Sequence, residues 1–215
     1  MNVDPIARWY RFIEHLVFGG ALEVHRFAFL DRLACARRIL VLGEGDGRAI
    51  AKLLVAAPHA HIDVFELSGK MIQLARERLG KEFIRVSFHQ QDALTASWPD
   101  EHYDGVITHF FLDCFTEDPL HGLVQRIAAV MTPDALWLVA DFAIPERGWR
   151  RHYATILIRI MYEFFSLTTG LDVHTLPRIG QILARAGLRR VAHLVDRSGM
   201  IRSEVWTRRA PETLT

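Results

Sequence analysis

From residue 38 onward, short apolar runs alternate with longer amphipathic stretches. Residues 39–42 (Ile-Leu-Val-Leu) form an uninterrupted apolar run, which is the pattern of a strand buried on both faces. Residues 46–57 then carry Ile50, Leu53 and Leu54 at helical spacing, and Pro58 ends that helix. The same rhythm predicts strands over 61–66, 83–89, 103–108 and 135–141, and helices over 69–80 and 119–131. This order is typical of a parallel sheet with crossover helices.

The pattern changes after Pro145. Apolar residues recur at steps of three and four from Trp149 to Phe164, which predicts a long helix. A shorter helix is expected over 177–186, and two strands over 189–195 and 200–208 flank a hairpin-like connection. We therefore expect one α/β domain over residues 1–215, with five βα steps and a terminal hairpin. Residues 1–37 are interpreted as an N-terminal helical cap and residues 146–170 as a lid insertion.

Composition narrows the class of protein. Half of the 215 residues are hydrophobic and 24% are charged, and the formal net charge is +1. This balance argues against a dedicated nucleic-acid binder, which typically carries a basic stripe. Cys35 and Cys114 lie far apart without a CxxC pattern, so we expect no metal site and a reducing compartment. Because no stretch is typical of a signal peptide or a spanning helix, we expect a cytoplasmic protein.

The strongest motif is Gly43-Glu44-Gly45-Asp46-Gly47, where the first predicted strand meets the first helix. Glycines permit a sharp turn there and let a ligand approach the backbone closely. The free N–H groups of the following helix favour a phosphate or a carboxylate. The dinucleotide pattern GxGxxG/A fails in both registers, because Arg48 or Ile50 occupies its last position. No phosphate-loop motif of the GxxxxGK type is present.

Two acidic residues follow the next strands. Glu66 ends the strand over 61–66, 23 residues after Gly43, where a carboxylate can accept hydrogen bonds from ribose hydroxyls. Asp92 lies just past the third predicted strand, where an acceptor can meet an exocyclic amine. With the glycine loop, both fall at carboxyl ends of strands, the side on which open α/β sheets bind ligands.

Together these residues resemble the motifs of class I S-adenosylmethionine (AdoMet)-dependent methyltransferases over nearly the whole chain. The glycine loop is similar to the first motif of that class, Phe65-Glu66-Leu67-Ser68 with Met71 to its ribose motif, and Asp92-Ala93 to its adenine motif. The ubiquinone/menaquinone biosynthesis C-methyltransferase branch is the most similar. That similarity rests on Ile6-Ala7 through Tyr10, Phe18-Gly19, His25-Arg26 and Phe110-Phe111-Leu112-Asp113-Cys114.

The resemblance implies a Rossmann-like fold with a seven-stranded, mostly parallel sheet, a terminal antiparallel hairpin and helices on both faces. It also implies AdoMet as methyl donor, S-adenosylhomocysteine as its product, and a small, hydrophobic or aromatic acceptor. One departure is Val41, at a position where the class often has an acid that holds the donor's α-amino group; Glu44, Asp46 or a backbone carbonyl would take over that role. The donor-binding residues implied are Tyr10, Gly43, Glu44, Gly45, Gly47, Glu66, Leu67, Met71, Asp92, Ala93 and His109.

Methyl transfer from a sulfonium needs alignment, exclusion of water and, for an acidic acceptor, a base. His109 and Asp113, past the fourth predicted strand, are the candidate bases, and Tyr153 is a further catalytic candidate. His109 is equally explained as a packing residue or a donor contact, and Asp113 as the cap of the next helix. An apolar stripe on the long helix is expected to line the acceptor pocket or, alternatively, to pack on the sheet or a second subunit: Trp149, Tyr153, Ile156, Ile160 and Phe164.

Three other functions compete. A non-catalytic AdoMet-binding protein with the same fold stays open, because fold does not dictate function. A nicotinamide oxidoreductase is disfavoured by the failed GxGxxG pattern, and a nucleic-acid methyltransferase by Thr108-His109-Phe110-Phe111, which stands where such enzymes commonly have Asn/Asp-Pro-Pro-aromatic. We expect a small-molecule acceptor, no nucleic acid, no stable membrane insertion, and a monomer or homodimer. The sequence leaves open whether residues 147–151 contact a membrane surface. It also leaves open which molecule is the acceptor and which of its atoms is methylated.

Overall fold

The computed structural model describes residues 20–98, 102–145, 147–170 and 173–208. Its centre is one seven-stranded sheet in the order β3-β2-β1-β4-β5-β7-β6, in which β7 runs antiparallel to both of its neighbours and the remaining pairs are parallel. This confirms the predicted fold class. The strands are β1 (Arg38–Leu42), β2 (His61–Phe65), β3 (Val86–His89), β4 (Tyr103–His109), β5 (Met131–Phe142), β6 (Arg189–Val195) and β7 (Ile201–Thr207).

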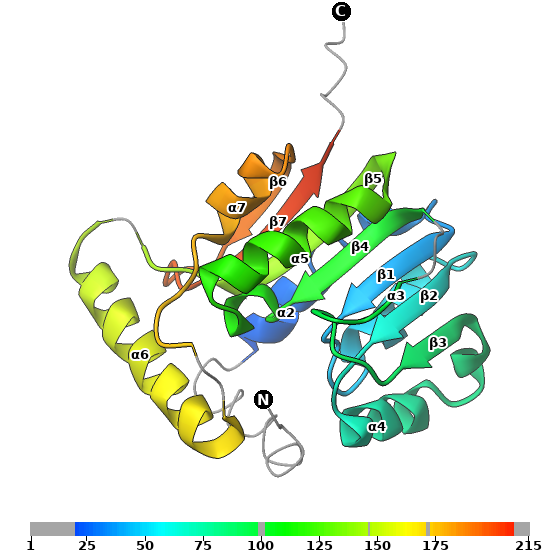
Figure 1. Ribbon diagram of the computed structural model, residues 1–215, viewed down its shortest axis with the longest axis horizontal. Helices are drawn as coiled ribbons and strands as arrows, with labels where there is room; N and C mark the ends of the chain where they lie inside the picture. Colours follow the sequence, from blue (N-terminus) through cyan, green and yellow to red (C-terminus); the bar gives the residue numbers. More distant parts are fainter. Residues whose placement is uncertain (1–19, 99–101, 146, 171–172, 209–215) are drawn as a thin grey trace, which may run out of the picture.

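Helices lie on both faces of the sheet, and α5 and α7 together cover one of them (Figure 1). A long helix, α6, lies beyond the carboxyl ends of the parallel strands (Figure 1). No described helix is long and apolar enough to cross a membrane. The α-helices are α2 (Ala21–Phe27), α3 (Arg48–Ala56), α4 (Gly69–Leu79), α5 (Glu117–Val130), α6 (Trp149–Thr169) and α7 (Ile179–Arg185); the 3-10 turns are η1 (Leu30–Leu33), η2 (Gly80–Arg85) and η3 (Leu112–Cys114).

The continuous apolar run of β1 is explained by its position at the centre of the sheet. Leu40 and Leu42 point into the core beneath α5 and α7, whereas Ile39 and Val41 point into the core beneath α3. All four side chains are at most 1% exposed. Because successive strand residues face opposite sides, a strand covered on both faces must be apolar at every position.

Two predicted boundaries were wrong. The third strand begins at Val86 and not at Phe83, since residues 80–85 form η2 and leave Phe83 and Ile84 exposed. The fifth strand begins at Met131 and not at Ala135, so that it includes Pro133-Asp134. That dipeptide instead lies in an irregularity of the β4–β5 pairing, where the register shifts between Tyr103 and Gly105. Proline lacks the N–H that a ladder needs and is tolerated at such irregularities.

The described part of the N-terminal segment, which contains α2, is hydrogen-bonded to strand β7 of the sheet. His25 Nδ1 lies 2.8 Å from Ser203 Oγ on β7, and the Ser203 hydroxyl donates to the His25 carbonyl. This double contact fixes α2, and with it the neighbouring Arg26, beside the carboxyl ends of β4 and β5. Helix α2 therefore positions a cation next to the candidate site.

Candidate functional site

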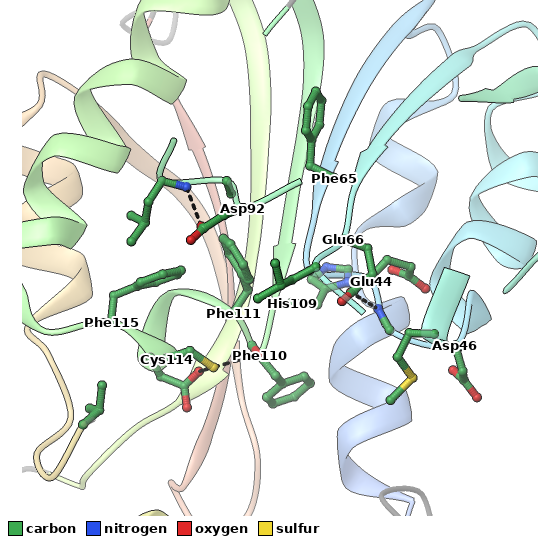
Figure 2. Close-up of a pocket in the computed structure, with 18 of the residues that line it drawn as sticks. Glu44, Asp46, Phe65, Glu66, Asp92, His109, Phe110, Phe111, Cys114 and Phe115 are labelled. Carbon is green, nitrogen blue, oxygen red and sulfur yellow. Dashed lines mark hydrogen bonds between the residues drawn. The ribbon is translucent and has the colours of Figure 1, made fainter. Parts of the chain in front are cut away.

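A cavity of about 1040 Å³ opens at the carboxyl edge of the sheet. Its walls come from the segments that follow β1, β2, β3, β4 and β5, and from α6. The strand order reverses between β1 and β4, and open α/β sheets bind ligands at such a switch point. In Figure 2, His109 and Phe111 lie between a side that holds Glu44 and Glu66 and a side that holds Cys114 and Phe115.

The glycine loop forms the first of these two sides. Gly43 and Gly45 have φ of 68° and 71°, in the left-handed region that favours glycine. A Cβ on Gly43 would stand 2.2 Å from Phe111 Cδ2, whereas a Cβ on Gly45 would meet nothing within 4 Å. Gly43 thus allows the Phe111 ring to pack on the backbone, and Gly45 leaves its face of the loop open to the cavity.

Gly47 has a different role from the one implied by the resemblance. A Cβ on this residue would lie 2.8 Å from Ala75 Cβ on α4, and Gly47 is not among the residues that line the cavity. The structure therefore gives Gly47 to the packing of α3 against α4. The loop therefore presents Gly45 to the cavity, packs Gly43 against Phe111 and uses Gly47 to bring two helices together.

Glu66 connects the glycine loop to the turn after β2. Its Oε2 accepts a hydrogen bond from the Gly45 N–H at 3.1 Å, and its Oε1 accepts one from the Ser68 N–H at 2.9 Å. The Ser68 hydroxyl in turn accepts from the Met71 N–H and caps α4. A carboxylate oxygen can accept more than one hydrogen bond, so a residue such as Glu66 can hold the loop and also accept hydrogen bonds from a ligand.

Glu44 lies buried against the start of α3. Its Oε1 accepts from the backbone N–H groups of Ala49 and Ile50, at 2.8 Å and 3.3 Å. Burial raises the pKa of Glu44 to about 7, although nearby Arg26 and the two backbone hydrogen bonds act in the opposite direction. Asp46, the other acid of the loop, lies 2.9 Å from both Arg48 and Arg78. Among the described residues, Glu44 is therefore the acid of the loop for which no ion pair with an arginine is seen, although the charge of Arg26 acts on it.

The remaining residues implied for the donor also line the cavity, with two exceptions. Leu67 and Met71 follow β2, and Asp92 and Ala93 follow β3. Asp92 Oδ1 already accepts from the Leu94 N–H at 2.9 Å, which fixes the turn after β3. Gly47 is the first exception, as described above. Tyr10, the second, lies outside the described residues.

His109 ends β4 and is 5% exposed. Its Nδ1 has no hydrogen-bond partner among the described residues. Burial lowers the pKa of His109 to about 3, and the positive charge of Arg26 contributes in the same direction. The imidazole is therefore neutral near pH 7 and is a poor proton acceptor, which makes it a weaker candidate base than its position alone indicated.

Asp113 lies deeper on the second side of the cavity, and the structure shows that it is not a helix cap. It is part of η3, and α5 begins after Thr116. The Tyr162 hydroxyl lies 3.3 Å from Asp113 Oδ2, and the Cys114 thiol lies 3.7 Å from Asp113 Oδ1. Burial raises the pKa of Asp113. It raises the pKa of neighbouring Asp141 further, because the negative charge of Asp113 adds to the effect of burial.

The prediction for α6 was wrong about which face is turned inward. Its buried residues are Ala154, Ile158 and Tyr162, and Met161 and Tyr162 line the cavity. Tyr153 is 57% exposed, and the structure does not bring it to the cavity. The reason is that α6 is apolar on two opposite faces, so periodicity alone could not choose between them. The predicted stripe lies on the exposed face: Trp149, Tyr153, Ile156, Ile160 and Phe164.

Sequence reasoning missed three residues beside the cavity. Arg26 lies with its guanidinium 5.3 Å from the centre of the Phe110 ring, and it was noted only as part of an N-terminal resemblance. Asp141 was placed at the end of a predicted strand but not singled out, although Glu66 was recognised by the same signal. Tyr162 was hidden in a long apolar helix. A hydroxyl among aliphatic neighbours was the available signal for Tyr162.

Comparison with known proteins agrees with this geometry. Residues 39–134 match the sequence model of a family described as a methyltransferase domain. The demethylmenaquinone methyltransferase of Deinococcus radiodurans is 27% identical over 69% of this chain and 55% of its own length. The ubiquinone/menaquinone biosynthesis C-methyltransferase UbiE of Dinoroseobacter shibae is 26% identical over 69% of this chain and 60% of its own. The chain thus spans between half and two thirds of each of these relatives.

A solved structure shows the same fold. The N-methyltransferase NodS from Bradyrhizobium japonicum, in complex with S-adenosylhomocysteine, has a TM-score of 0.64 at 17% identity, covering 86% of this chain and 87% of that one. Residues 39–134 thus match a methyltransferase domain family, and the chain has a class I, Rossmann-like fold. The comparisons confirm the resemblance to class I methyltransferases of the UbiE-like kind.

Proposed function

We propose that this protein transfers the methyl group of AdoMet to a small aromatic acceptor whose ring bears an acidic hydroxyl. One observation carries the proposal: a single cavity joins the glycine loop to an aromatic chamber that contains a buried carboxyl group. The first part can hold a donor and the second an acceptor. A protein that only bound AdoMet would have no need of the second part.

The residues on the glycine-loop side fit the donor. Gly45 leaves open backbone next to the start of α3, which suits a carboxylate, and the Glu44 carboxyl nearby suits an ammonium group. Glu66 offers its carboxylate to ribose hydroxyls, and Asp92 with Ala93 borders the place for an adenine ring. When bound, AdoMet supplies an electrophilic methyl group on a sulfonium whose sulfur keeps the bonding electrons.

The opposite side of the cavity fits a ring-shaped, apolar acceptor. Its wall is formed by several aromatic rings and a methionine: Phe110, Phe111, Phe115, Phe142, Met161 and Tyr162. Such a surface favours flat apolar molecules, and a few polar groups fix their orientation. Two similar proteins are named for menaquinone and ubiquinone biosynthesis, which supports a hydroquinone as the class of acceptor.

Asp113 is the residue that we assign as base. It accepts the proton of the acceptor's hydroxyl, which raises the electron density of the ring and prepares it to attack the methyl group. Asp141 keeps its own proton, because two neighbouring buried carboxyl groups do not both ionise. The Tyr162 hydroxyl donates to Asp113 and orients its carboxylate. A pKa raised by burial makes Asp113 a better proton acceptor than an exposed aspartate.

The test is conversion of AdoMet to S-adenosylhomocysteine with a panel of benzo- and naphthohydroquinones. We expect turnover with at least one of them, and a single-turnover rate about 10²- to 10⁴-fold lower in Asp113→Asn at saturating donor. Donor affinity should be unchanged in that variant. Asp118→Asn, which changes an exposed acid in the first turn of α5, is the matched control and should react like the wild type.

Two outcomes would contradict the proposal in different ways. A rate within about threefold of wild type in Asp113→Asn would mean that this residue is not the base. Donor binding without turnover on any hydroquinone would mean that the acceptor class is wrong or that the protein does not catalyse transfer. A wider panel of phenols, amines and thiols separates those two cases.

A further inference from the structure

The exposed face of α6 carries a continuous apolar stripe. Its six residues follow one another at steps of four, three, four, four and three, and each is between 38% and 87% exposed. At about 100° per residue, they fall within a sector of roughly 80° on the helix surface. Soluble proteins rarely leave a large contiguous apolar surface open to water. The stripe consists of Trp149, Tyr153, Ile156, Ile160, Phe164 and Leu167.

The charges around the stripe are mainly positive. Helix α6 contains three arginines and one glutamate, and Arg147 precedes its first turn. Arg147 and Arg159 are exposed, and Arg159 lies about 60° around the helix axis from Ile156, at the edge of the stripe; Arg151, also exposed, lies on the opposite side of the helix. The glutamate, Glu163, lies 3.6 Å from His174. A surface that combines an apolar stripe with flanking arginines is complementary to an anionic lipid bilayer.

The types of residue along the stripe support the same partner. Trp149 and Tyr153 lie at its first end with their ring centres 6.5 Å apart, and the residues that follow are aliphatic except for Phe164. Tryptophan and tyrosine favour the boundary between lipid headgroups and acyl chains. Since α6 stands at the margin of the molecule, beyond the carboxyl ends of the parallel strands (Figure 1), its outer face can lie flat on a surface.

We propose that the outer face of α6 docks the protein on the surface of an anionic membrane. The helix then lies in the plane of the interface, with the stripe in the outer acyl layer and the arginines at the headgroups. The opposite face of the same helix supplies Met161 and Tyr162 to the cavity, so docking brings the cavity next to the bilayer. The proposal does not depend on methyl transfer, because docking is measured without donor or acceptor.

The experiment is co-sedimentation of the full chain with phosphatidylcholine vesicles, with and without phosphatidylglycerol. We expect binding to the anionic vesicles that weakens as salt is raised. The double variant Ile156→Ser with Ile160→Ser should bind at least about tenfold more weakly. The double variant Arg147→Gln with Arg159→Gln should lose the preference for anionic lipid. Circular dichroism and affinity for S-adenosylhomocysteine, which should not change, report that the variants are folded.

The matched control changes exposed aliphatic residues away from α6. Val55 on α3 and Ile84 on η2 are 80% and 82% exposed, and the double variant Val55→Ser with Ile84→Ser should bind vesicles like the wild type. Absence of wild-type binding, or equal binding by the Ile156/Ile160 variant, overturns the proposal. So does a stripe variant that changes the oligomeric state in sedimentation while the wild type ignores vesicles. That result would assign the stripe to contact between copies of the chain.

Discussion

Alanine substitution at two glycines of the loop after β1 should have different effects: mainly on stability at Gly43 and mainly on ligand affinity at Gly45. Gly43 and Gly45 both have φ near +70°, so an alanine at either position pays the cost of the left-handed conformation, about 1–2 kcal/mol. At Gly43, the added Cβ would also stand 2.2 Å from Phe111 Cδ2, where an ordinary contact needs at least 3.4 Å. The ring must move by about 1.2 Å, and overpacking of this kind costs a further ~1–3 kcal/mol.

Gly43→Ala is therefore expected to lower the free energy of unfolding by ~2–5 kcal/mol and Gly45→Ala by only ~1–2 kcal/mol. Ligand affinity, by contrast, should fall in Gly45→Ala, since the Cβ of that residue would enter open space at the cavity wall. We expect affinity for S-adenosylhomocysteine to fall at least about tenfold in Gly45→Ala, the equivalent of ~1.4 kcal/mol. Urea unfolding measures the first quantity and isothermal titration calorimetry the second.

A double-mutant cycle with Phe111→Ala isolates the clash. In that background, Gly43→Ala should cost no more than Gly45→Ala, because the ring that opposes the new Cβ is gone. Equal destabilisation by the two single substitutions would refute the packing of Phe111 on Gly43. Unchanged affinity in Gly45→Ala would refute the placement of the donor against this loop.

Two further predictions concern the acids of the donor side. Glu66→Ala should weaken binding of S-adenosylhomocysteine by ~1.5–3 kcal/mol, the scale of hydrogen bonds to a charged acceptor. The control Glu82→Ala removes an exposed acid on η2 and should have no effect. Equal affinities of the two variants by calorimetry would show that Glu66 does not contact the bound molecule. The pKa of Glu44 near 7 implies that affinity should rise as the pH increases from about 6 to about 7.5, because the carboxyl must ionise to hold an ammonium group. Glu44→Gln should remove this dependence, and a slope retained in that variant would assign it to another group.

The parts of the fold that could be predicted are those that local sequence determines. A continuous apolar run such as residues 39–42 is typical of a strand covered on both faces, and alternate glycines directly after it mark a tight loop. Glu66 and Asp92 could be placed on the same edge because parallel strands end together. These inferences need no knowledge of which helix covers which face.

The parts that could not be predicted depend on tertiary contacts. Helix α6 presents Ala154, Ile158 and Tyr162 inward, although its outer stripe is more aromatic, because the inner residues fit beside Phe142 and Cys114. The depressed pKa of His109 arises from burial and from Arg26, which is distant in sequence. The pairing of Asp113 with Asp141 needs β4 and β5 to be neighbours in the sheet. Sequence therefore predicted candidate residues that line one cavity, but not the electrostatic state of their groups.

The most direct test of the donor and acceptor assignment is a crystal structure with S-adenosylhomocysteine bound. We expect the amino-acid end of the ligand at residues 43–47 with its ammonium near Glu44, the ribose hydroxyls within hydrogen-bond distance of Glu66, and the adenine against Asp92 and Ala93. Its sulfur should face the chamber that holds Phe111 and Asp113. A ligand found among Phe115, Met161 and Tyr162 instead, or one whose sulfur faces away from Asp113, would contradict the account.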